Sequence, residues 1–486
     1  MRVIKLVLFL VLVLAAVLAY NTAQLQRKKT APSAAALAPV DEAAAAQRLA
    51  GAVQIPTISY SDRSAIDLTR LEALADYLQI QFPRLHATLQ REVVNEHSLL
   101  YTWPGRDLAA PPLLFLAHLD VVPIEPGSEG LWTHAPFSGD IADGYVWGRG
   151  TIDDKASVLA WQEALEILVA SGFQPQRTLY FAFGHDEEIG GEQGAAKIAA
   201  LLKERGVKAE FALDEGGVIT NGVFPGISRP VASIMAAEKG YASFRLTARA
   251  SGGHSSMPPR TTAVGAVARA VARLQEQPMP ARLAPPTTDM LDRLAPEMPL
   301  LLKVAVANRW LFAPLLIHEL GKAPVSDALL RTTTAPTMLR AGIKDNVLPS
   351  EASAVVNFRL LPGDTLAAVE HHIRDVVADP QIEIAHEGEA GNEASPVSDT
   401  RSAAFALLER SVNEVFPNAV VSSGIVIGTT DLRNYNGVFE RRYNFVPTPL
   451  TPEDLPRIHG SNERIAIADY ANIVRFYVRL LQNLNS

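Results

Sequence analysis

The chain has 486 residues, of which 48% are hydrophobic and 20% are charged, a balance typical of a globular protein with more than one domain. Its formal net charge of -8 argues against a nucleic-acid partner, because binding to phosphates needs a basic surface. The sequence contains no cysteine, which excludes disulfide bonds and thiolate metal sites.

The N-terminus begins with basic residues and continues with an apolar segment. Arg2 and Lys5 precede fourteen consecutive apolar residues, 6–19. The pattern predicts a signal anchor or a signal peptide at 1–23, followed by an Ala- and Pro-rich linker at 24–44. A buried N-terminal helix is the alternative. Either export signal takes the chain out of the cytosol: an anchor keeps it on the membrane, and cleavage releases it as a secreted or periplasmic protein.

Helices and short apolar strands alternate along the first half of the chain. Helices are predicted at 43–53, 67–81, 156–170 and 194–203, and strands at 113–117, 179–183 and 211–213. The strands show no alternation of apolar and polar side chains, as expected when both faces are covered. We therefore predict an α/β domain with a mixed, mostly parallel sheet and flanking helices.

A second pattern begins near residue 239. Segments 241–250 and 354–360 alternate strictly between apolar and polar side chains, as strands with one wet face do. With helices at 264–275 and 365–377 and a strand at 382–384, they predict a smaller α+β lid domain of ferredoxin-like arrangement. A buried strand at 424–428 and a helix at 465–484 then return to the first pattern. The predicted domains are therefore 45–238 and 389–486, interrupted by 239–388.

A long insertion lies inside this second domain. Its segment 300–320 is very apolar but is interrupted by Lys303, Asn308, Arg309 and Pro314. We interpret it as buried or interface helices, because a membrane span needs about 20 predominantly apolar residues.

Histidines and carboxylates follow three of the buried strands. These groups are His118 with Asp120, Glu187 with Glu188, and Asp214 with Glu215. Because the carboxyl ends of parallel strands meet at one edge of a sheet, we expect the three groups to lie close together. Two further segments, 148–155 and 458–460, add Asp153 and His459. Imidazole and carboxylate ligands without thiols suit zinc and similar divalent cations.

From about residue 45 to its end, the chain resembles the M20 family of metallopeptidases and amidohydrolases. It is most similar to the subgroup of carboxypeptidase S and N-fatty-acyl-amino-acid synthase/hydrolase. The resemblance rests on H-x-D after a strand, G-R-G-x-x-D-x-K, D-E-E-x-G-G, L-D-E-G-G, S-G-G-H-S-S, the Asn-Val before a strand, G-T-T-D and I-H-G-x-N-E. The insertion, residues 281–335, also resembles the carboxypeptidase S type.

The resemblance implies two zinc ions, for which cobalt or manganese can substitute. Asp153 would bridge them, His118 and Asp214 would hold one ion, and Glu188 and His459 the other. Glu215 is the neighbour that can replace Asp214 as a ligand, and the sequence does not decide between them.

The resemblance also implies the catalytic roles. Glu187 would be the general base, acting on a water that bridges the ions, and Asp120 would accept a hydrogen bond from the ring of His118. His254 would stabilise the oxyanion. In dimeric relatives this histidine acts in the partner's site, so its role here depends on whether the chain forms a homodimer through the lid. The alternative for His254 is a cap on a Gly-rich turn. Asn346 matches the second polar lid residue, and Arg433 would clamp a substrate carboxylate unless it is a surface residue.

Three functions remain open at this stage. The first is reversible cleavage of the amide bond of N-acyl amino acids or small peptides with a free carboxylate. The second is a broad dipeptidase or exopeptidase, and the third is a non-catalytic binding protein on the same scaffold. The presence of Glu187 and every ligand argues against the third. The apolar insertion suits an acyl pocket, a dimer face or a membrane-docking surface.

Overall fold

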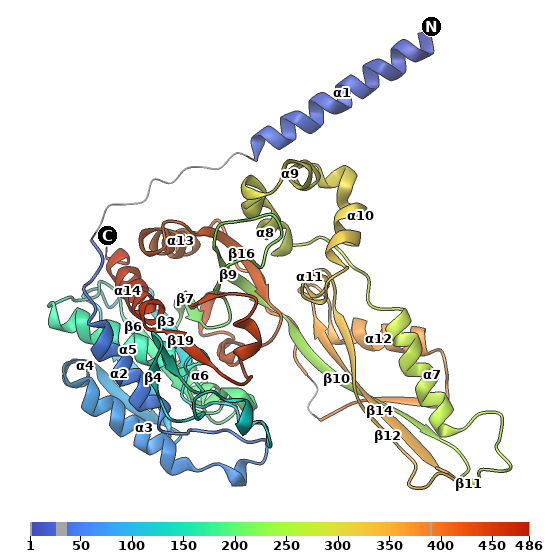
Figure 1. The fold of residues 1–486 in the computed structure, drawn as a ribbon, viewed down its shortest axis with the longest axis horizontal. Helices are drawn as coiled ribbons and strands as arrows, with labels where there is room; N and C mark the ends of the chain where they lie inside the picture. The colour runs from blue at the N-terminus through green and yellow to red at the C-terminus, as the bar shows by residue number, and fades with distance from the viewer. Residues whose placement is uncertain (1, 26–35, 389–390, 486) are drawn as a thin grey trace.

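The computed structural model describes residues 2–25, 36–388 and 391–485. Its first helix, α1 (Arg2–Gln24), projects from the rest of the molecule, which consists of a large domain and a smaller unit inserted into it (Figure 1). Residues 26–35 of the predicted linker and the predicted domain boundary at 388/389 lie outside the described residues. The other predicted boundaries stay predictions.

The large domain is built on a ten-stranded sheet. Its strands run in the order β1-β2-β6-β3-β7-β17-β9-β8-β18, and β16 pairs with β9. Their bounds are β1 Gln90–Val94, β2 Ser98–Trp103, β3 Leu113–His118, β6 Leu179–Gly184, β7 Ala209–Asp214, β8 Ile219–Thr220, β9 Val231–Glu238, β16 Val420–Val426, β17 Phe439–Asn444 and β18 Pro449–Leu450. Strands β6, β3, β7 and β17 run parallel. The predicted α/β fold class with a mixed sheet is therefore confirmed.

Helices cover both faces of this sheet. One face carries α2 (Glu42–Val53), α5 (Lys155–Ala170), α13 (Ala403–Val415) and α14 (Ile467–Asn483), with α3 (Leu68–Gln81) and α4 (Pro83–Thr88) outside them. The other face carries α6 (Ala195–Glu204). Every residue of β3 is buried, which explains why its sequence shows no alternation. A small sheet of β4 (Ile141–Ala142), β5 (Tyr145–Trp147) and β19 (Arg464–Ala466) lies beside α2.

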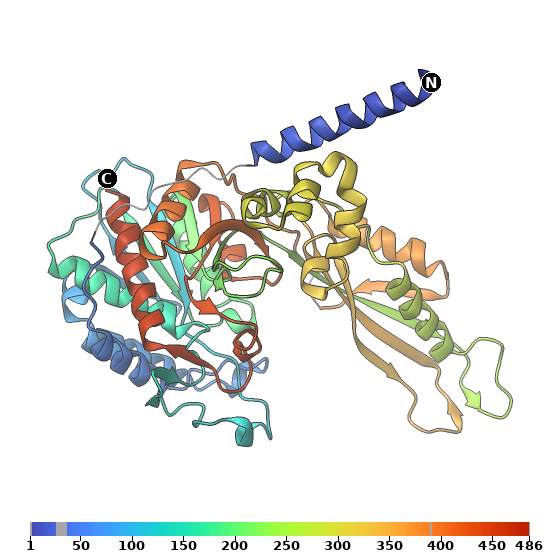
Figure 2. The same cartoon turned by 45° about the horizontal axis from the view of Figure 1, so that its top comes forward.

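The inserted unit is a four-stranded antiparallel sheet with two helices on one face. Its elements follow in the order β10 (Gly240–Arg249), α7 (Ala263–Glu276), β12 (Thr333–Ala341), β14 (Glu351–Leu360), α12 (Leu366–Val377) and β15 (Ile382–His386), and its strand order is β12-β14-β10-β15. The βαββαβ succession is that of a ferredoxin-like fold. Alternate residues of β10 and β14 face α7 and α12, including Phe244 and Phe358, and form a separate core. Two short strands, β11 (Gly253–His254) and β13 (Val347–Leu348), close the tip of the unit farthest from the large domain (Figures 1 and 2).

The segment between α7 and β12 forms a separate helical lobe. It contains α8 (Thr287–Leu294), α9 (Leu300–Ala307), α10 (Arg309–Leu320) and α11 (Pro324–Ala328). Although the segment lies within the predicted lid, its core packs on Val231 of β9 and Val420 of β16, in the large domain. The sequence predicts that 300–320 forms buried or interface helices. Burial does not hold for most of the segment, because only Ala305, Val306 and Leu316 of α9 and α10 are buried, and the interface alternative stays a prediction.

Candidate metal centre

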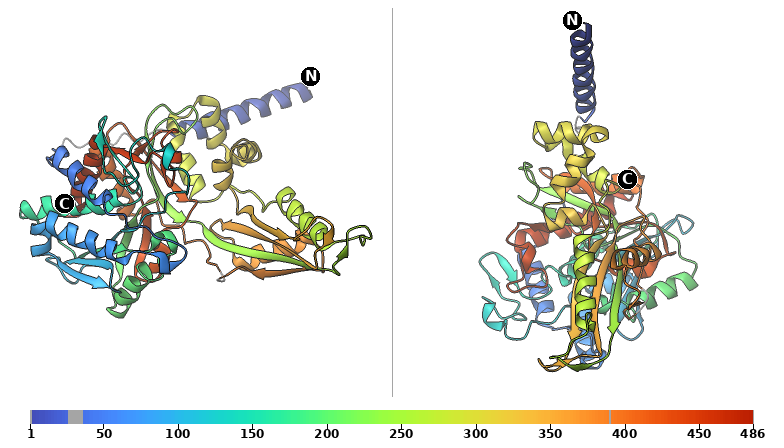
Figure 3. Two further views of the ribbon diagram at one scale, coloured as in Figure 1. Left: turned by 60° about the horizontal axis from the view of Figure 1, so that its bottom comes forward. Right: turned by 90° about the vertical axis from the view of Figure 1, so that its right-hand side faces the viewer.

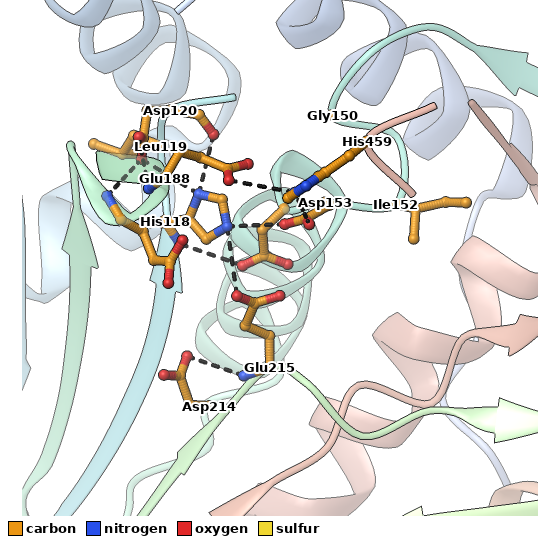
Figure 4. A network of polar contacts seen from close by, with 12 residues as sticks. His118, Leu119, Asp120, Gly150, Ile152, Asp153, Glu188, Asp214, Glu215 and His459 are labelled. Atoms are coloured by element: carbon orange, nitrogen blue, oxygen red, sulfur yellow. Dashed lines mark hydrogen bonds and ion pairs between the residues drawn. The ribbon is translucent and has the colours of Figure 1, made fainter. Parts of the chain in front are cut away.

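Histidines and carboxylates converge at the carboxyl edge of the main sheet, as the sequence predicts. His118 ends β3, Asp214 ends β7, and Glu187 opens the short helix that follows β6. Asp153 precedes α5, and His459 enters from a loop near the C-terminus. The edge thus collects side chains from five segments of the chain (Figure 4).

Asp153 lies at the centre of this cluster. One oxygen, Oδ1, is 2.9 Å from Nε2 of His118, and the other, Oδ2, is 3.0 Å from Nε2 of His459 (Figure 4). Each carboxylate oxygen therefore faces a different histidine. Two ligands of a tetrahedral zinc site stand about 3.3 Å apart when each is 2.0–2.2 Å from the ion, so both spacings suit a shared ion.

A glutamate completes each side of the cluster. Oε2 of Glu188 is 3.3 Å from His459 Nε2, and Oε1 of Glu215 is 3.6 Å from His118 Nε2. His118, Asp153 and Glu188 place one ligand atom each within 4.8 Å of one another, and so do His118, Asp154 and Glu215. The second oxygen of Glu188, Oε1, is buried and has no hydrogen-bond partner among the described residues, which suits an oxygen reserved for a cation.

The carboxylate of Asp214 takes a different direction from the one expected for a ligand. Its Oδ1 accepts the backbone N–H of Glu215 at 2.9 Å, and its Oδ2 accepts that of Leu432 at 3.2 Å. In Figure 4 it lies below the cluster, whereas Glu215 reaches His118. Glu215 directly follows the last residue of β7 and turns toward His118, whereas the backbone contacts of Asp214 hold its carboxylate away from the cluster. The geometry therefore favours Glu215 over Asp214 as the ligand, a choice that the sequence leaves open.

The cluster holds more negative charge than its histidines balance. Burial raises the pKa of Glu187, Glu215 and Asp154 well above the usual range, and neighbouring carboxylates add to the rise. Hydrogen bonds to Asp153 and Glu188 raise the pKa of His459 to about 10. A divalent cation would stabilise the ionised form of these crowded carboxylates. The donor set, two imidazoles and the carboxylates of Asp153, Glu188 and Glu215 without sulfur, fits zinc.

Asp120 orients both His118 and the loop that follows β6. Nδ1 of His118 is 3.0 Å from the backbone carbonyl of Asp120 and 3.3 Å from its Oδ1. The Asp120 carboxylate also accepts the backbone N–H groups of Glu187 and Glu188, at 3.1 and 3.2 Å, and the hydroxyl of Ser59 at 2.6 Å. Burial opposes ionisation of Asp120, but these hydrogen bonds outweigh it and lower the pKa of Asp120. The sequence predicts the contact with His118 but not the contacts with the loop.

Glu463 holds the loop that presents Asp153, a role that the sequence did not suggest. Its Oε1 accepts the backbone N–H groups of Gly150, Ile152 and Asp153 at 2.8–3.1 Å. Its Oε2 pairs with Arg149 at 2.6 Å, and both side chains are buried. Arg149 in turn donates to the carbonyl of His459 at 3.0 Å, which supports the left-handed backbone of His459 at a φ of 60°. One buried carboxylate thus ties two ligand-bearing segments together.

The Gly-rich part of the loop after β6 is also fixed by a carboxylate. Asp186 accepts the backbone N–H groups of Gln193 and Gly194 at 2.9 and 2.7 Å and pairs with Arg63 at 2.9 Å. Gly191 has a φ of 72°, and a Cβ there would lie 2.3 Å from Asp431. The two glycines of D-E-E-x-G-G therefore let the chain turn sharply next to Glu187 and Glu188.

A cleft of about 1060 Å³ opens beside the cluster and reaches the base of the inserted unit. Glu187, Glu188 and His459 line it, together with Arg433 from the large domain and Arg359 from β14. Nη1 of Arg359 is buried without a hydrogen-bond partner among the described residues. Burial lowers the pKa of Arg359, and the nearby Arg433 adds to the lowering. Arg433 thus lines the cleft, where its predicted contact with a substrate carboxylate stays a prediction, and Arg359 is a second cation there that the sequence did not suggest.

His254 and Asn346 lie together but away from the cluster. His254 is in β11 and Asn346 directly precedes β13, so both are at the tip of the inserted unit (Figure 1). The carbonyl of Asn346 accepts the N–H of Ser255 at 3.2 Å, and Nδ1 of His254 lies 2.7 Å from the hydroxyl of Ser256. In this arrangement of the two units, neither side chain reaches Asp153.

Comparisons with known proteins show which family the chain belongs to. Residues 114–483 match Peptidase family M20/M25/M40. The probable carboxypeptidase S-like 2 of Dictyostelium discoideum is 42% identical over 444 residues, covering 90% of this chain and 84% of that protein. The N-fatty-acyl-amino acid synthase/hydrolase of Xenopus tropicalis is 40% identical over 441 residues, covering 90% and 85%.

Solved structures share the fold at lower identity. An M20 family metallo-carboxypeptidase from Sulfolobus solfataricus has a TM-score of 0.66 at 18% identity, covering 92% of this chain and 99% of its own. Human carnosine dipeptidase 1 has a TM-score of 0.63 at 16% identity, covering 97% and 98%. The resemblance seen in the sequence motifs is confirmed, and the chain belongs to Peptidase family M20/M25/M40 as a hydrolytic enzyme.

Proposed function

We propose that the protein is a di-zinc hydrolase that cleaves, reversibly, the amide bond of N-acyl amino acids or small peptides with a free carboxylate. The observation that carries this proposal is the carboxylate of Asp153, whose two oxygens face His118 and His459 separately. His118, Asp153 and Glu215 would hold one ion, and Asp153, Glu188 and His459 the other. When bound, the zinc ions supply a Lewis acid that polarises the amide carbonyl and lowers the pKa of water.

Glu187 is the general base in this proposal. It lines the cleft next to the ligand Glu188, while its own carboxylate has no place in either ligand group. The hydrogen bond from its backbone N–H to Asp120 fixes the base of the side chain. Glu187 takes a proton from the attacking water and gives it to the amide nitrogen as the C–N bond breaks. The products are a carboxylic acid and an amine, and the reverse sequence forms the amide.

Two arginines support a substrate with a free carboxylate. Arg359 and Arg433 line the same cleft as Glu187, and Arg359 has an unpaired buried N–H group. A guanidinium binds a carboxylate through two parallel hydrogen bonds, so the pair would fix the amino-acid end of the substrate. The acyl end would then extend along the cleft past the metal cluster.

His254 and Asn346 would act after closure of the inserted unit or from the partner of a homodimer. Both residues lie at the exposed tip, away from Asp153, which supports a role that depends either on closure or on a partner subunit. Once near the substrate, the imidazole would donate a hydrogen bond to the oxyanion.

A broader dipeptidase or carboxypeptidase activity is the second candidate. Relatives named carboxypeptidase S-like share about the same identity with this chain as the N-fatty-acyl-amino acid synthase/hydrolases do. A binding protein without activity is not supported, because the base and the ligands for both ions are present.

Helix α1 supports the proposal that the enzyme is exported and anchored. It is long and apolar enough to cross a membrane by length and composition, and it begins with Arg2 and Lys5. Basic residues favour the cytosolic side, which would leave the large domain outside. A truncated protein starting at Val40 should remain folded and active in solution, since the core begins with α2.

A hydrolysis screen tests the substrate class. The metal-free protein is supplied with zinc, cobalt or manganese separately and is offered N-acyl amino acids of different acyl length, their carboxamide analogues and dipeptides. Cleavage of N-acyl amino acids but not of their carboxamides supports the proposal. Preference for dipeptides favours the second candidate, and no turnover with any metal would reject both.

A further inference from the structure

The helical lobe, α8 to α11, carries a group of exposed apolar side chains next to helix α1. Within α9 and α10, Leu301 is 84% exposed, Leu300 69%, Trp310 64%, Leu315 51% and Leu311 42%. Large apolar patches on soluble proteins usually mark a surface that meets another molecule or a membrane. Only three residues of these two helices are buried, so α9 and α10 leave several large apolar side chains without cover from the described parts of the chain.

The lobe is fastened to the end of α1. Asn21 donates to Oδ1 of Asn308 at 2.9 Å, and Asn308 donates to the carbonyl of Leu18 at 3.3 Å. Asn308 lies between α9 and α10 and is fully buried. Leu25, just after α1, packs on the core of the lobe. The last turns of α1 thus contact the lobe, while residues 3–17 are exposed along their whole length.

This contact defines where a bilayer would lie. With 23 residues, α1 is about 34 Å long, slightly more than the roughly 30 Å of a hydrocarbon core. If its basic end is cytosolic, its Asn21 end emerges at the opposite membrane surface. Figure 3 shows α1 leaving the molecule beside the helical lobe. The exposed leucines and Trp310 therefore lie at the level where a helix meets lipid headgroups, and tryptophan is enriched at that level.

We propose that α9 and α10 form a membrane-docking surface that rests on the outer leaflet of the bilayer spanned by α1. The occupant is lipid, because the exposed surface is continuous with the contact between the lobe and the anchor. Helices of this kind lie in the interface with their apolar side chains a few ångströms deep. The inference rests on the proposal that α1 spans a membrane, and it does not depend on which amide the enzyme cleaves.

The docked lobe would also set the position of the cleft. The buried ammonium of Lys239, between β9 and β10, donates to the carbonyls of Ala328 and Arg331 at 2.8 Å each. Lys239 lines the cleft, so the end of the lobe is bonded to a wall of the active site. Docking would therefore hold the cleft at a fixed height near the membrane.

The absence of cysteine allows a direct test with single spin labels. The full chain is reconstituted into vesicles of equal parts phosphatidylcholine and phosphatidylglycerol, with a nitroxide on Leu301→Cys or Leu311→Cys. Leu10→Cys, in α1, reports the bilayer interior. Leu108→Cys and Met257→Cys, 76% and 79% exposed in the large domain and at the tip of the inserted unit, report water. Collisions with oxygen and with a water-soluble nickel complex are measured for each label.

Docking predicts that the labels at 301 and 311 shift from the values of the two water controls toward that of Leu10→Cys, with more oxygen and less nickel collision. Values equal to those of the water controls would overturn the proposal, as would a Leu10 label that stays accessible to nickel. Loss of nickel collision together with dipolar broadening between labels, and without a gain in oxygen collision, would assign the surface to a second copy of the chain instead. Hydrolysis of a water-soluble N-acyl amino acid is assayed in the same vesicles, so that failure of the proposed function is seen separately.

Discussion

The metal cluster and the tip of the inserted unit both carry predicted functional residues, but they are held in different ways. Asp153, His118 and Glu188 are buried or nearly so and are fixed by hydrogen bonds from several segments. His254 and Asn346 are exposed at a hairpin-like tip, and their contacts are with their immediate neighbours. The cluster is therefore organised within the large domain itself, whereas in the proposed mechanism the tip would need a movement or a second subunit before it could act.

The largest effect is expected at Glu187, because in the proposed mechanism it transfers the proton and binds no metal. Glu187→Gln should lower kcat by about 10²–10⁴-fold while the zinc content and the fold remain unchanged. Steady-state kinetics and elemental analysis measure the two quantities. Glu192→Gln is the matched control, since Glu192 lies on the same loop and is exposed. A kcat for Glu187→Gln within about tenfold of the unmodified enzyme would contradict the assignment.

The number of bound zinc ions should depend on which carboxylates face the cluster, not on which residue the sequence motif implies as the ligand. Asp153→Ala should lose both ions, because each of its oxygens faces one histidine. Glu215→Ala should lose one, and Asp214→Asn should keep two, since the Asp214 carboxylate binds backbone N–H groups. Elemental analysis after dialysis decides. If Asp214→Asn loses zinc and Glu215→Ala does not, Asp214 is the ligand after all.

The difference between Asp214 and Glu215 shows what the sequence can and cannot predict. Apolar runs that end in polar residues predicted β3, β6 and β7 and their common edge, because such runs are the mark of buried parallel strands. Which of two adjacent carboxylates faces the cluster depends on Leu432, which lies 218 residues further along the chain. No local pattern contains that contact.

Contacts between distant parts of the chain also explain the other differences between the sequence predictions and the structure. Glu463 belongs to a recognised motif, but its partners are backbone N–H groups more than 300 residues away. Residues 300–320 were expected to be buried or to form an interface, and which of the two holds depends on where α1 and the large domain lie. The position of His254 relative to Asp153 depends on how two units are arranged, which neither unit's own sequence pattern determines.

Substitution of His254 tests whether the tip of the inserted unit takes part in catalysis. His254→Ala should lower kcat by about 10²–10³-fold with little change in KM, because an oxyanion contact forms mainly in the transition state. His371→Ala, an exposed histidine on α12 of the same unit, is the control. An unchanged kcat in His254→Ala would remove this residue from the mechanism.

Mixing two inactive variants distinguishes closure from a partner's contribution. If His254 acts in the partner subunit, combining His254→Ala with Glu187→Ala should restore part of the activity once subunits exchange. If it acts within its own chain, the mixture should stay inactive. Exchange itself is followed with two affinity tags, so that an inactive mixture containing both tags counts against action in the partner.

Glu463 tests how far the cluster depends on its supporting contacts. Glu463→Gln keeps one acceptor but loses the charge that binds Arg149 and three backbone N–H groups. We expect about a 10–100-fold fall in zinc affinity, as is typical when groups that orient metal ligands are changed. Competition with a chelator measures it, with the exposed Glu453→Gln as control. Unchanged affinity would show that the loop holds its shape without this charge.

The smallest effect is expected at Arg359, which belongs to the inserted unit but already faces the cleft. It lies on β14 at the end nearest the large domain, whereas His254 lies at the other end. Arg359→Met should raise KM for N-acyl amino acids by roughly 10–100-fold, which corresponds to about 1.5–3 kcal/mol for a hydrogen bond to a charged group. Arg340→Met, an exposed arginine on β12, should leave KM unchanged.

The carboxamide analogue of the same substrate identifies the contact. If Arg359 binds the substrate carboxylate, the carboxamide should bind weakly to the unmodified enzyme and lose little more in Arg359→Met. Equal loss for both substrates would mean that Arg359 shapes the cleft without touching the carboxylate. If Arg359→Met changes KM and His254→Ala changes kcat, the two ends of the inserted unit have different roles. Its base would bind substrate in any arrangement of the units, and its tip would act in catalysis only after closure or from a partner subunit.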